Sequence, residues 1–169
     1  ADPVAHVAAG EPEASPITEP RNLHLPERLN AAGINFASAI DMSKLQKGMQ
    51  DAQALREEQA IATVPVHCAA VVPVTSPSDR RVTLGRWRPT APESIPAVIE
   101  AAAAAQPAWS RVPLETRCAV LVEAGDLLEQ RRDEFVQLLA SEAGKTLNDG
   151  IAEVREAVDF CRYYAAMAR

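Results

Sequence analysis

The most regular hydrophobic pattern in the sequence lies near its C-terminal end. Apolar residues recur there every three or four positions, at Ile151, Val154, Val158, Cys161 and Ala165. This spacing matches the period of an α-helix and predicts a stripe that faces a core. Thr146 and Asp149 have the spacing of a capping box, which favours a helix start at this point. We therefore predict a final helix that starts after Thr146 and is still continuing at Arg169.

The same helix carries a second apolar face. At about 100° per residue, four further apolar residues fall opposite the core stripe: Ala152, Phe160, Tyr163 and Met167. Glu156 lies in the middle of this second face. Since a surface helix normally buries one face, we expect the second face to cover something that this chain scarcely supplies.

Two helices are predicted before this one. An Ala-rich helix is expected over residues 95–105, with Thr90 and Glu93 at capping-box spacing before it and a stop near residues 106–107. Pro113 then opens the next helix, where its missing N–H is not needed. The apolar stripe of that helix comprises Leu114, Cys118, Leu121, Gly125 and Leu128.

Two more helices complete the prediction. One should end at Gly144, because glycine readily adopts the left-handed conformation that ends helices. Its apolar positions are Phe135, Leu138 and Leu139. The other is expected over residues 41–60 with Asp41 as its N-cap. Its loose apolar stripe comprises Leu45, Met49 and Leu55.

β-Branched residues dominate residues 61–88 instead. They include Val64, Val66, Val71, Val72, Val74 and Val82. The Ser-Pro-Ser-Asp sequence at residues 76–79 favours a turn, so two short antiparallel strands are predicted around it. Pro65 and Pro73 lack the amide donor that a central strand needs, which places at least one strand at an edge.

The N-terminal part has weaker patterns. Residues 1–20 contain four prolines and no periodicity, which is typical of a flexible linker or tail. Within residues 21–60, a short helical turn is expected over residues 26–30 and a bend over residues 31–35.

Composition and charge narrow the class of protein. The formal net charge of −6, without a cluster of Lys or Arg, argues against nucleic acid or an anionic membrane surface as a partner. No apolar run is long enough to span a bilayer, and the first twenty residues lack the features of a signal peptide. Three widely spaced cysteines favour neither disulfides nor a zinc site, so a reducing cytoplasm is the expected compartment.

Three stretches of the sequence resemble one protein family. The first comprises residues 142–146 (EAGKT) and 151–165 (IAEVREAVDFCRYYA), which are similar to the N-terminal helices of aldehyde dehydrogenases. The version found here resembles the glutamate-semialdehyde dehydrogenase half of bifunctional proline utilisation enzymes. Residues 23–35 (LHLPERLNAAGIN) resemble the segment that joins the two catalytic halves of those enzymes, and residues 73–81 resemble the strand pair that opens the dehydrogenase domain.

The resemblance implies a domain organisation and a fold. Residues 1–20 would be a flexible linker or tail, residues 21–60 an inter-domain connecting segment, and residues 61–169 the N-terminal part of an aldehyde dehydrogenase domain. The complete enzyme would have the α/β aldehyde dehydrogenase fold. This segment of it should be mainly α-helical with a short antiparallel strand pair.

The resemblance also implies an activity. The parent enzyme would oxidise L-glutamate 5-semialdehyde to glutamate with NAD, and proline on an FAD-bearing domain outside this chain. The attacking cysteine would lie downstream of this segment, so the segment alone should be inactive. The full enzyme would be a homo-oligomer, with any peripheral membrane association confined to the absent flavin domain. Two alternatives stay open: a monofunctional aldehyde dehydrogenase for another substrate, and a non-catalytic helical interaction module.

Glu156 is the candidate substrate-binding residue. A carboxylate among apolar neighbours could select the ammonium group of an amino-acid substrate, and the resemblance places this position in the aldehyde pocket. Cys118 and Cys161 lie on core stripes and are interpreted as packing residues. Residues 144–146 (GKT) lack the earlier glycine and the preceding strand of a P-loop. We therefore predict no catalytic, cofactor-binding or metal-binding residue within this chain.

Overall fold

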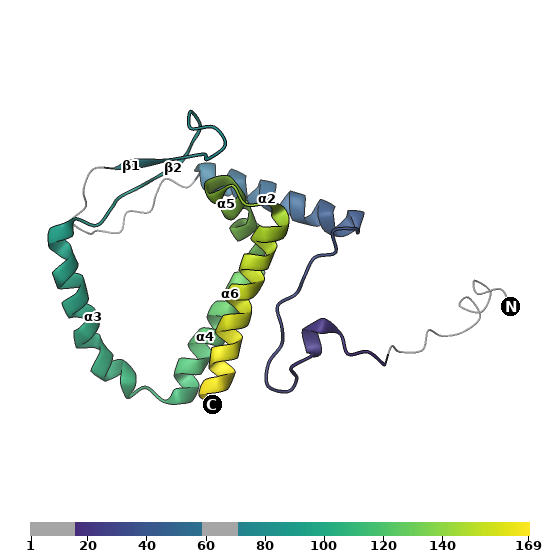
Figure 1. Cartoon of the computed structure of the whole chain (residues 1–169). Helices are drawn as coiled ribbons and strands as arrows, with labels where there is room; N and C mark the ends of the chain where they lie inside the picture. The colour runs from purple at the N-terminus through teal and green to yellow at the C-terminus, as the bar shows by residue number, and fades with distance from the viewer. Residues whose placement is uncertain (1–15, 59–70) are drawn as a thin grey trace.

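The computed structural model describes residues 16–58 and 71–169 (Figure 1). These residues form mainly helices and one two-stranded antiparallel sheet, as predicted. The elements in chain order are η1 (Pro20–Asn22), α2 (Ala39–Glu58), β1 (Val72–Thr75), β2 (Thr83–Trp87), η2 (Pro92–Ser94), α3 (Ile95–Ser110), α4 (Leu114–Gln130), α5 (Arg132–Ala143) and α6 (Leu147–Ala168). Within the described ranges, no helix is both long and apolar enough to cross a membrane.

Helices α4 and α6 lie side by side and antiparallel at the centre (Figure 1). Most of the predicted core stripe of α6 is buried, and Val158 and Ala165 are 0% exposed. The predicted start of α6 is also confirmed, since the Thr146 hydroxyl accepts a hydrogen bond from the Asp149 amide. Gly125 permits the close approach of α4, because a Cβ there would lie 3.2 Å from the Cβ of Cys161.

Helices α5 and α2 close one end of this pair. Val136 of α5 and Leu45 of α2 are fully buried and join the stripe of α6 in one core cluster. Gly144 ends α5 in the left-handed conformation with φ of 66°, as predicted. The expected N-cap of α2 is wrong: the Ser38 hydroxyl accepts the Asp41 amide, so Asp41 already lies in the first turn.

The β1–β2 hairpin confirms the predicted strand pair. Val72 pairs with Trp87 and Pro73 with Arg86, and the register shifts after Val74. The predicted strand residues before position 71 lie outside the described residues. The turn contacts the helical body, since a Cβ on Gly144 would lie 3.3 Å from the Pro77 ring.

Helix α3 differs from the prediction. It continues through Pro107 to Ser110 instead of stopping near residue 106. None of its residues is buried, so water can bond to the carbonyl of Ala103 that Pro107 leaves without a donor. The capping box expected at Thr90 and Glu93 is also wrong, because η2 starts after Ala91 without a side-chain cap.

The segment before α2 also differs. Its helical turn lies at Pro20–Asn22, earlier than the expected residues 26–30. Residues 31–35 are not a bend; a turn comes at residues 36–37 instead. The amides of Ala31 and Ala32 are hydrogen-bonded to side chains of distant helices, and these bonds hold the backbone in place of a local turn.

Candidate functional site

The second apolar face of α6 is uncovered in the described part of the chain. Phe160 is 49% exposed and Met167 is 62% exposed, although both are large and apolar. The Phe160 and Tyr164 rings stack with centroids 5.9 Å apart. The Arg28 guanidinium lies over the Tyr163 ring, 5.8 Å from its centroid, and covers one part of the face. This arrangement agrees with the prediction of two apolar faces on one helix.

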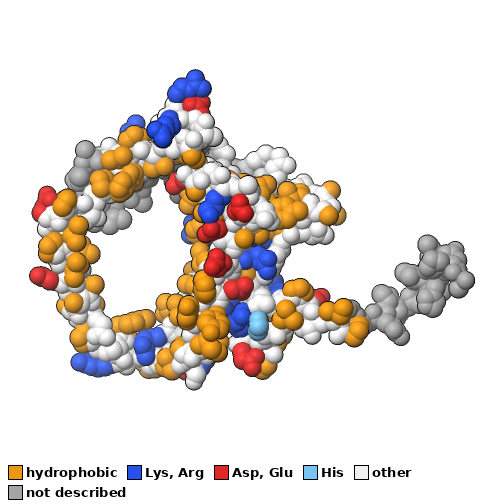
Figure 2. Space-filling view, in the orientation of Figure 1, with side chains coloured by type: hydrophobic (Ala, Val, Ile, Leu, Met, Phe, Trp, Pro, Cys, Tyr) orange, Lys and Arg blue, Asp and Glu red, His pale blue; other side chains and the backbone are white. Residues whose placement is uncertain are grey.

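Exposed apolar side chains also line an opening through the molecule. Figure 2 shows this opening between α3, the β1–β2 hairpin and the α4–α6 pair, with hydrophobic side chains along its inner edge. Helix α3 carries several large exposed apolar side chains, among them Val98, Ile99 and Trp109. Contiguous exposed apolar surface is typical of a site that packs against further protein.

Glu156 is exposed on the second face of α6, four residues before Phe160. Within residues 16–58 and 71–169, no ion pair or hydrogen bond of its carboxylate is present. The structure therefore places Glu156 where the pattern predicted, but brings no charged partner to it. Its proposed contact with a substrate ammonium stays a prediction.

A buried charge network lies on the other side of α6, and the sequence pattern did not reveal it. Arg162 is charged, yet its side chain is only 8% exposed. Its Nη2 donates to Asp126 Oδ1 and to Glu129 Oε2 of α4, each at 2.7 Å. These partners are 36 and 33 residues away in sequence, so no local spacing could have indicated them.

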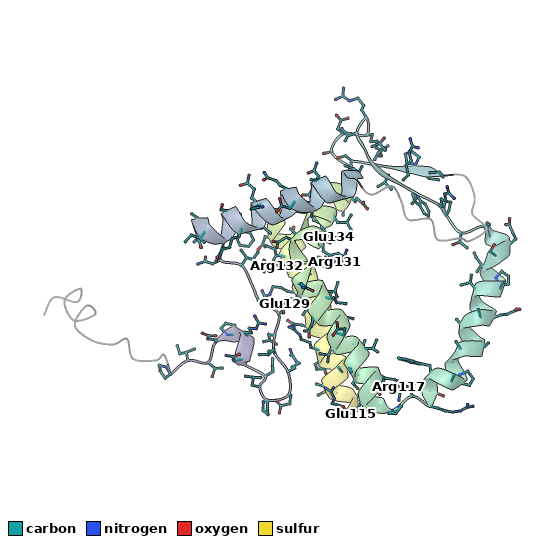
Figure 3. All side chains as sticks on the ribbon, turned by 180° about the vertical axis from the view of Figure 1, so that it is seen from behind. Glu115, Arg117, Glu129, Arg131, Arg132 and Glu134 are labelled. Carbon is teal, nitrogen blue, oxygen red and sulfur yellow. The ribbon has the colours of Figure 1, made fainter. Side chains whose placement is uncertain are left out.

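Glu129, which lies near the C-terminal end of α4 (Figure 3), makes most of the contacts of this network. Its Oε1 accepts the Ala32 amide at 2.6 Å, and Arg21 Nη2 lies 3.6 Å from its Oε2. Partial burial raises the pKa of Glu129, but the Ala32 amide, the Arg162 guanidinium and the charge of Arg21 lower it more. The net result is a pKa below the ordinary value, so Glu129 is charged at neutral pH.

Asp159 contacts the N-terminal segment as well. Its Oδ1 accepts the Ala31 amide at 2.7 Å and lies 4.0 Å from Arg28 Nη1. Helical spacing alone favours an ordinary surface pair of Asp159 with Arg155, one turn earlier on α6. Arg155 lies instead beside Gly33, where a Cβ would be 3.8 Å from its guanidinium carbon.

The cysteines and the GKT sequence have structural surroundings. Cys118 is buried, Cys161 is partly buried, and both are free thiols on the α4–α6 interface; Cys68 lies outside the described residues. Gly144 follows a helix, and Lys145 pairs with Glu153. Among the described residues no cluster of potential ligands could hold a metal ion.

The described residues form no loop that could bind the phosphates of a dinucleotide. Phosphate loops need several backbone N–H groups presented by glycines between a strand and a helix. Gly144 instead ends α5, lies two residues before the N-cap Thr146 of α6 and stands against Pro77. We therefore assign none of the described residues to NAD or FAD.

Comparison with known proteins gives one consistent family. The sequence profile of the aldehyde dehydrogenase family matches residues 66–169. The bifunctional protein PutA of Escherichia coli K12 is 34% identical over 152 residues, which are 89% of this chain and 11% of that protein. The 1-pyrroline-5-carboxylate dehydrogenase 2 of Bacillus subtilis is 37% identical over 100 residues, 59% of this chain and 19% of that protein. This chain thus spans a small part of the relatives that it matches.

Solved structures agree with the sequence comparison. A variant of proline utilization A from Bradyrhizobium japonicum superposes with a TM-score of 0.64 at 33% identity, over 94% of this chain and 13% of that chain. A 1-pyrroline-5-carboxylate dehydrogenase variant from Thermus thermophilus has a TM-score of 0.69 at 23% identity, over 84% of this chain and 28% of that chain, which supports the fold alone. The predicted fold class is therefore confirmed. Because the family profile covers more than half of the sequence, this chain belongs to the aldehyde dehydrogenase family.

Proposed function

We propose that this chain is part of an NAD-dependent dehydrogenase that oxidises L-glutamate 5-semialdehyde to glutamate in proline catabolism. In this proposal the parent protein also carries an FAD-dependent proline dehydrogenase. The observation that carries it is the similarity to bifunctional PutA over 89% of the chain, since an alignment this long includes most of the segment before residue 66 as well as the helices. The cytoplasmic location and the homo-oligomer expected from the sequence belong to the same proposal.

The chain would provide surface that packs against the rest of the enzyme, but it would not provide the reacting groups. In the reaction, NAD would accept the hydride of the aldehyde carbon. Cys118 is buried and Cys161 is partly buried in helix packing, so neither is placed to attack an aldehyde. The uncovered apolar face of α6 and the opening beside α3 are surfaces that further protein would fill. We therefore expect the 169-residue chain alone to be inactive.

Glu156 would bind the amino-acid end of the substrate. An exposed carboxylate on an apolar face becomes desolvated when further protein packs around it, and its attraction for an ammonium group then strengthens. A charge-assisted hydrogen bond of this kind is worth about 1.5–3 kcal/mol. Glu156→Gln in the parent enzyme should therefore raise the KM for glutamate semialdehyde by about tenfold or more.

The test compares two carboxylates on the same helix. Glu153→Gln is the matched control, because Glu153 is exposed on another flank of α6 and pairs with Lys145. NAD reduction should follow normal kinetics in this control. An unchanged KM in Glu156→Gln would remove Glu156 from the substrate site, and absence of semialdehyde oxidation in the unaltered parent would refute the proposed function. An intact mass of 18.1 kDa together with robust activity would refute the expectation that this chain alone is inactive.

A second candidate is an aldehyde dehydrogenase for a semialdehyde that lacks the ammonium group. A 2,5-dioxopentanoate dehydrogenase of Saccharolobus solfataricus is 34% identical over 93 residues, 55% of this chain and 20% of that protein. The two candidates differ in what Glu156 can bind. If the parent prefers the oxo substrate and Glu156→Gln leaves that preference unchanged, the second candidate replaces the first.

A further inference from the structure

Residues 19–35, which we call the connecting segment, lie against α4 and α6 although about a hundred residues separate them in sequence (Figure 1). Two consecutive backbone amides make the contact. The Ala31 amide donates to Asp159 of α6, and the Ala32 amide donates to Glu129 of α4. Each carboxylate comes from a different helix, so the segment bridges the helix pair.

Side chains reinforce these two bonds. Ala31 is buried and belongs to the same core cluster as Val154 and Val158. Upstream, Arg28 lies beside both Asp159 and the Tyr163 ring. The segment is therefore held by apolar burial at Ala31 and by the charge of Arg28 upstream of it.

The upstream half of the segment is closed on itself. The Asn30 amide donates to the carbonyl of Arg21 at 2.9 Å, and Asn30 Nδ2 donates to the carbonyl of Pro20 at 2.8 Å. Arg28 also donates to Asn30 Oδ1. Because these bonds tie residues 20–30 into one loop, fixing residues 31–32 fixes the loop as well.

We propose that Asp159 and Glu129 form a carboxylate clasp, which fixes the connecting segment on α4–α6 and thereby sets the point at which the preceding part of the parent protein is attached. The clasp recognises backbone N–H groups, so it depends on the path of the segment more than on its side chains. The identity of the preceding part, a flavin domain, rests on the proposed function. Within that scheme Asp159 and Glu129 are positioning residues and take no part in chemistry.

Asp159→Ala is the most selective test. The contacts of Asp159 are with the connecting segment, whereas Glu129 also holds Arg162 and supports the α4–α6 packing. Hydrogen exchange at the amides of residues 31 and 32 should become about tenfold faster or more, because a hydrogen bond to a charged group is lost. Exchange within α4 and α6 should stay unchanged. Glu153→Ala, on the same helix but paired with Lys145, is the control and should leave exchange in the connecting segment unchanged.

A second variant tests the other half of the clasp without altering either helix. Ala32→Pro removes the donor N–H and leaves Glu129 bonded to Arg162. Tryptic cleavage after Arg28 should then become about tenfold faster or more. Unchanged exchange and cleavage in both variants would refute the clasp. Loss of the α4–α6 protection in Asp159→Ala would also refute it, since the carboxylate would then serve helix packing.

The attachment point is measured in the parent enzyme. Spin labels on the connecting segment and on α6 should give a narrow distance distribution in the unaltered protein and a broad one in Asp159→Ala. A distribution that stays narrow in this variant would refute the positioning role. Measuring NAD reduction by the semialdehyde separates the proposed function from the clasp. If the unaltered parent shows no NAD reduction, the proposed function is refuted, whereas the clasp is still judged by the hydrogen-exchange result.

Discussion

Replacing Arg162 by methionine should destabilise the helix pair by about 2 kcal/mol, which corresponds to about thirtyfold in the unfolding equilibrium. Methionine keeps the length of the buried stem and removes the guanidinium. Loss of the pair with Glu129 costs more, about 2 kcal/mol. Glu129 is only 18% exposed, and its negative charge would stay without the positive charge of Arg162 beside it. The pair with Asp126 adds at most about 1 kcal/mol, since Asp126 is 54% exposed and water can replace its partner.

An opposing contribution reduces the total. Arg162 Nη1 is buried without a hydrogen-bond partner among the described residues, and removing it recovers about 1 kcal/mol of desolvation cost. The net value of about 2 kcal/mol is therefore below the range of about 3–5 kcal/mol for breaking a fully buried pair.

Urea unfolding of the chain, followed by far-ultraviolet circular dichroism, measures this change. Arg169→Met is the control, because its partner Glu115 is 72% exposed and the pair should contribute less than about 1 kcal/mol. The double variant with Glu129→Gln should recover part of the loss, since it also removes the uncompensated carboxylate. If Arg162→Met is as stable as the unaltered chain, or more stable, the reasoning about this network is refuted.

Three further predictions concern packing, backbone conformation and pH. Val158→Ala should lower the free energy of unfolding by about 2–3 kcal/mol in the same urea assay, because Val158 is 0% exposed. The control is Val120→Ala at an exposed site, which should change this free energy by less than about 0.5 kcal/mol. Gly144→Ala should cost about 1–2 kcal/mol, since its left-handed φ strains any side chain; a thermal scan without a shift would contradict this. The lowered pKa of Glu129 means that its stabilising contribution is complete above its unfolded pKa of about 4.3 and is lost as the pH falls through the folded pKa. In Glu129→Gln, the free energy of unfolding should therefore fall less between neutral and acidic pH than in the unaltered chain. Urea unfolding at a series of pH values measures this difference.

The elements that could be predicted are those that depend on residues close to one another in the sequence. The α6 stripe repeats over four turns and begins at a capping threonine, so periodicity and capping indicate the same helix. The hairpin was predictable because β-branched residues flank a turn sequence. Gly144 needed only the preference of one residue for a left-handed helix end.

The errors have causes that lie outside the local sequence. Pro107 does not end α3, because an exposed helix can leave one carbonyl to water and continue. Arg162 is buried because its partners Asp126 and Glu129 lie on another helix, which the spacing along α6 does not indicate. The amides of residues 31–32 are bound by side chains about a hundred residues away. Interactions across the fold decide these three features, and helical spacing carries no information about them.

Helix α6 connects the proposed substrate contact with the proposed clasp. Asp159 and Arg162 hold the connecting segment and α4, and Glu156 lies on the uncovered apolar face of the same helix. Asp159 is less than one helical turn from Glu156, so the two proposed roles lie on one short stretch of α6. The buried stripe around Val158 anchors α6 in the core. The helix therefore resists rotation when a substrate or the connecting segment binds to one of its faces. A rigid α6 would therefore keep the position of Glu156 independent of whether the clasp is open, which is why Asp159→Ala is expected to loosen the connecting segment without changing semialdehyde oxidation.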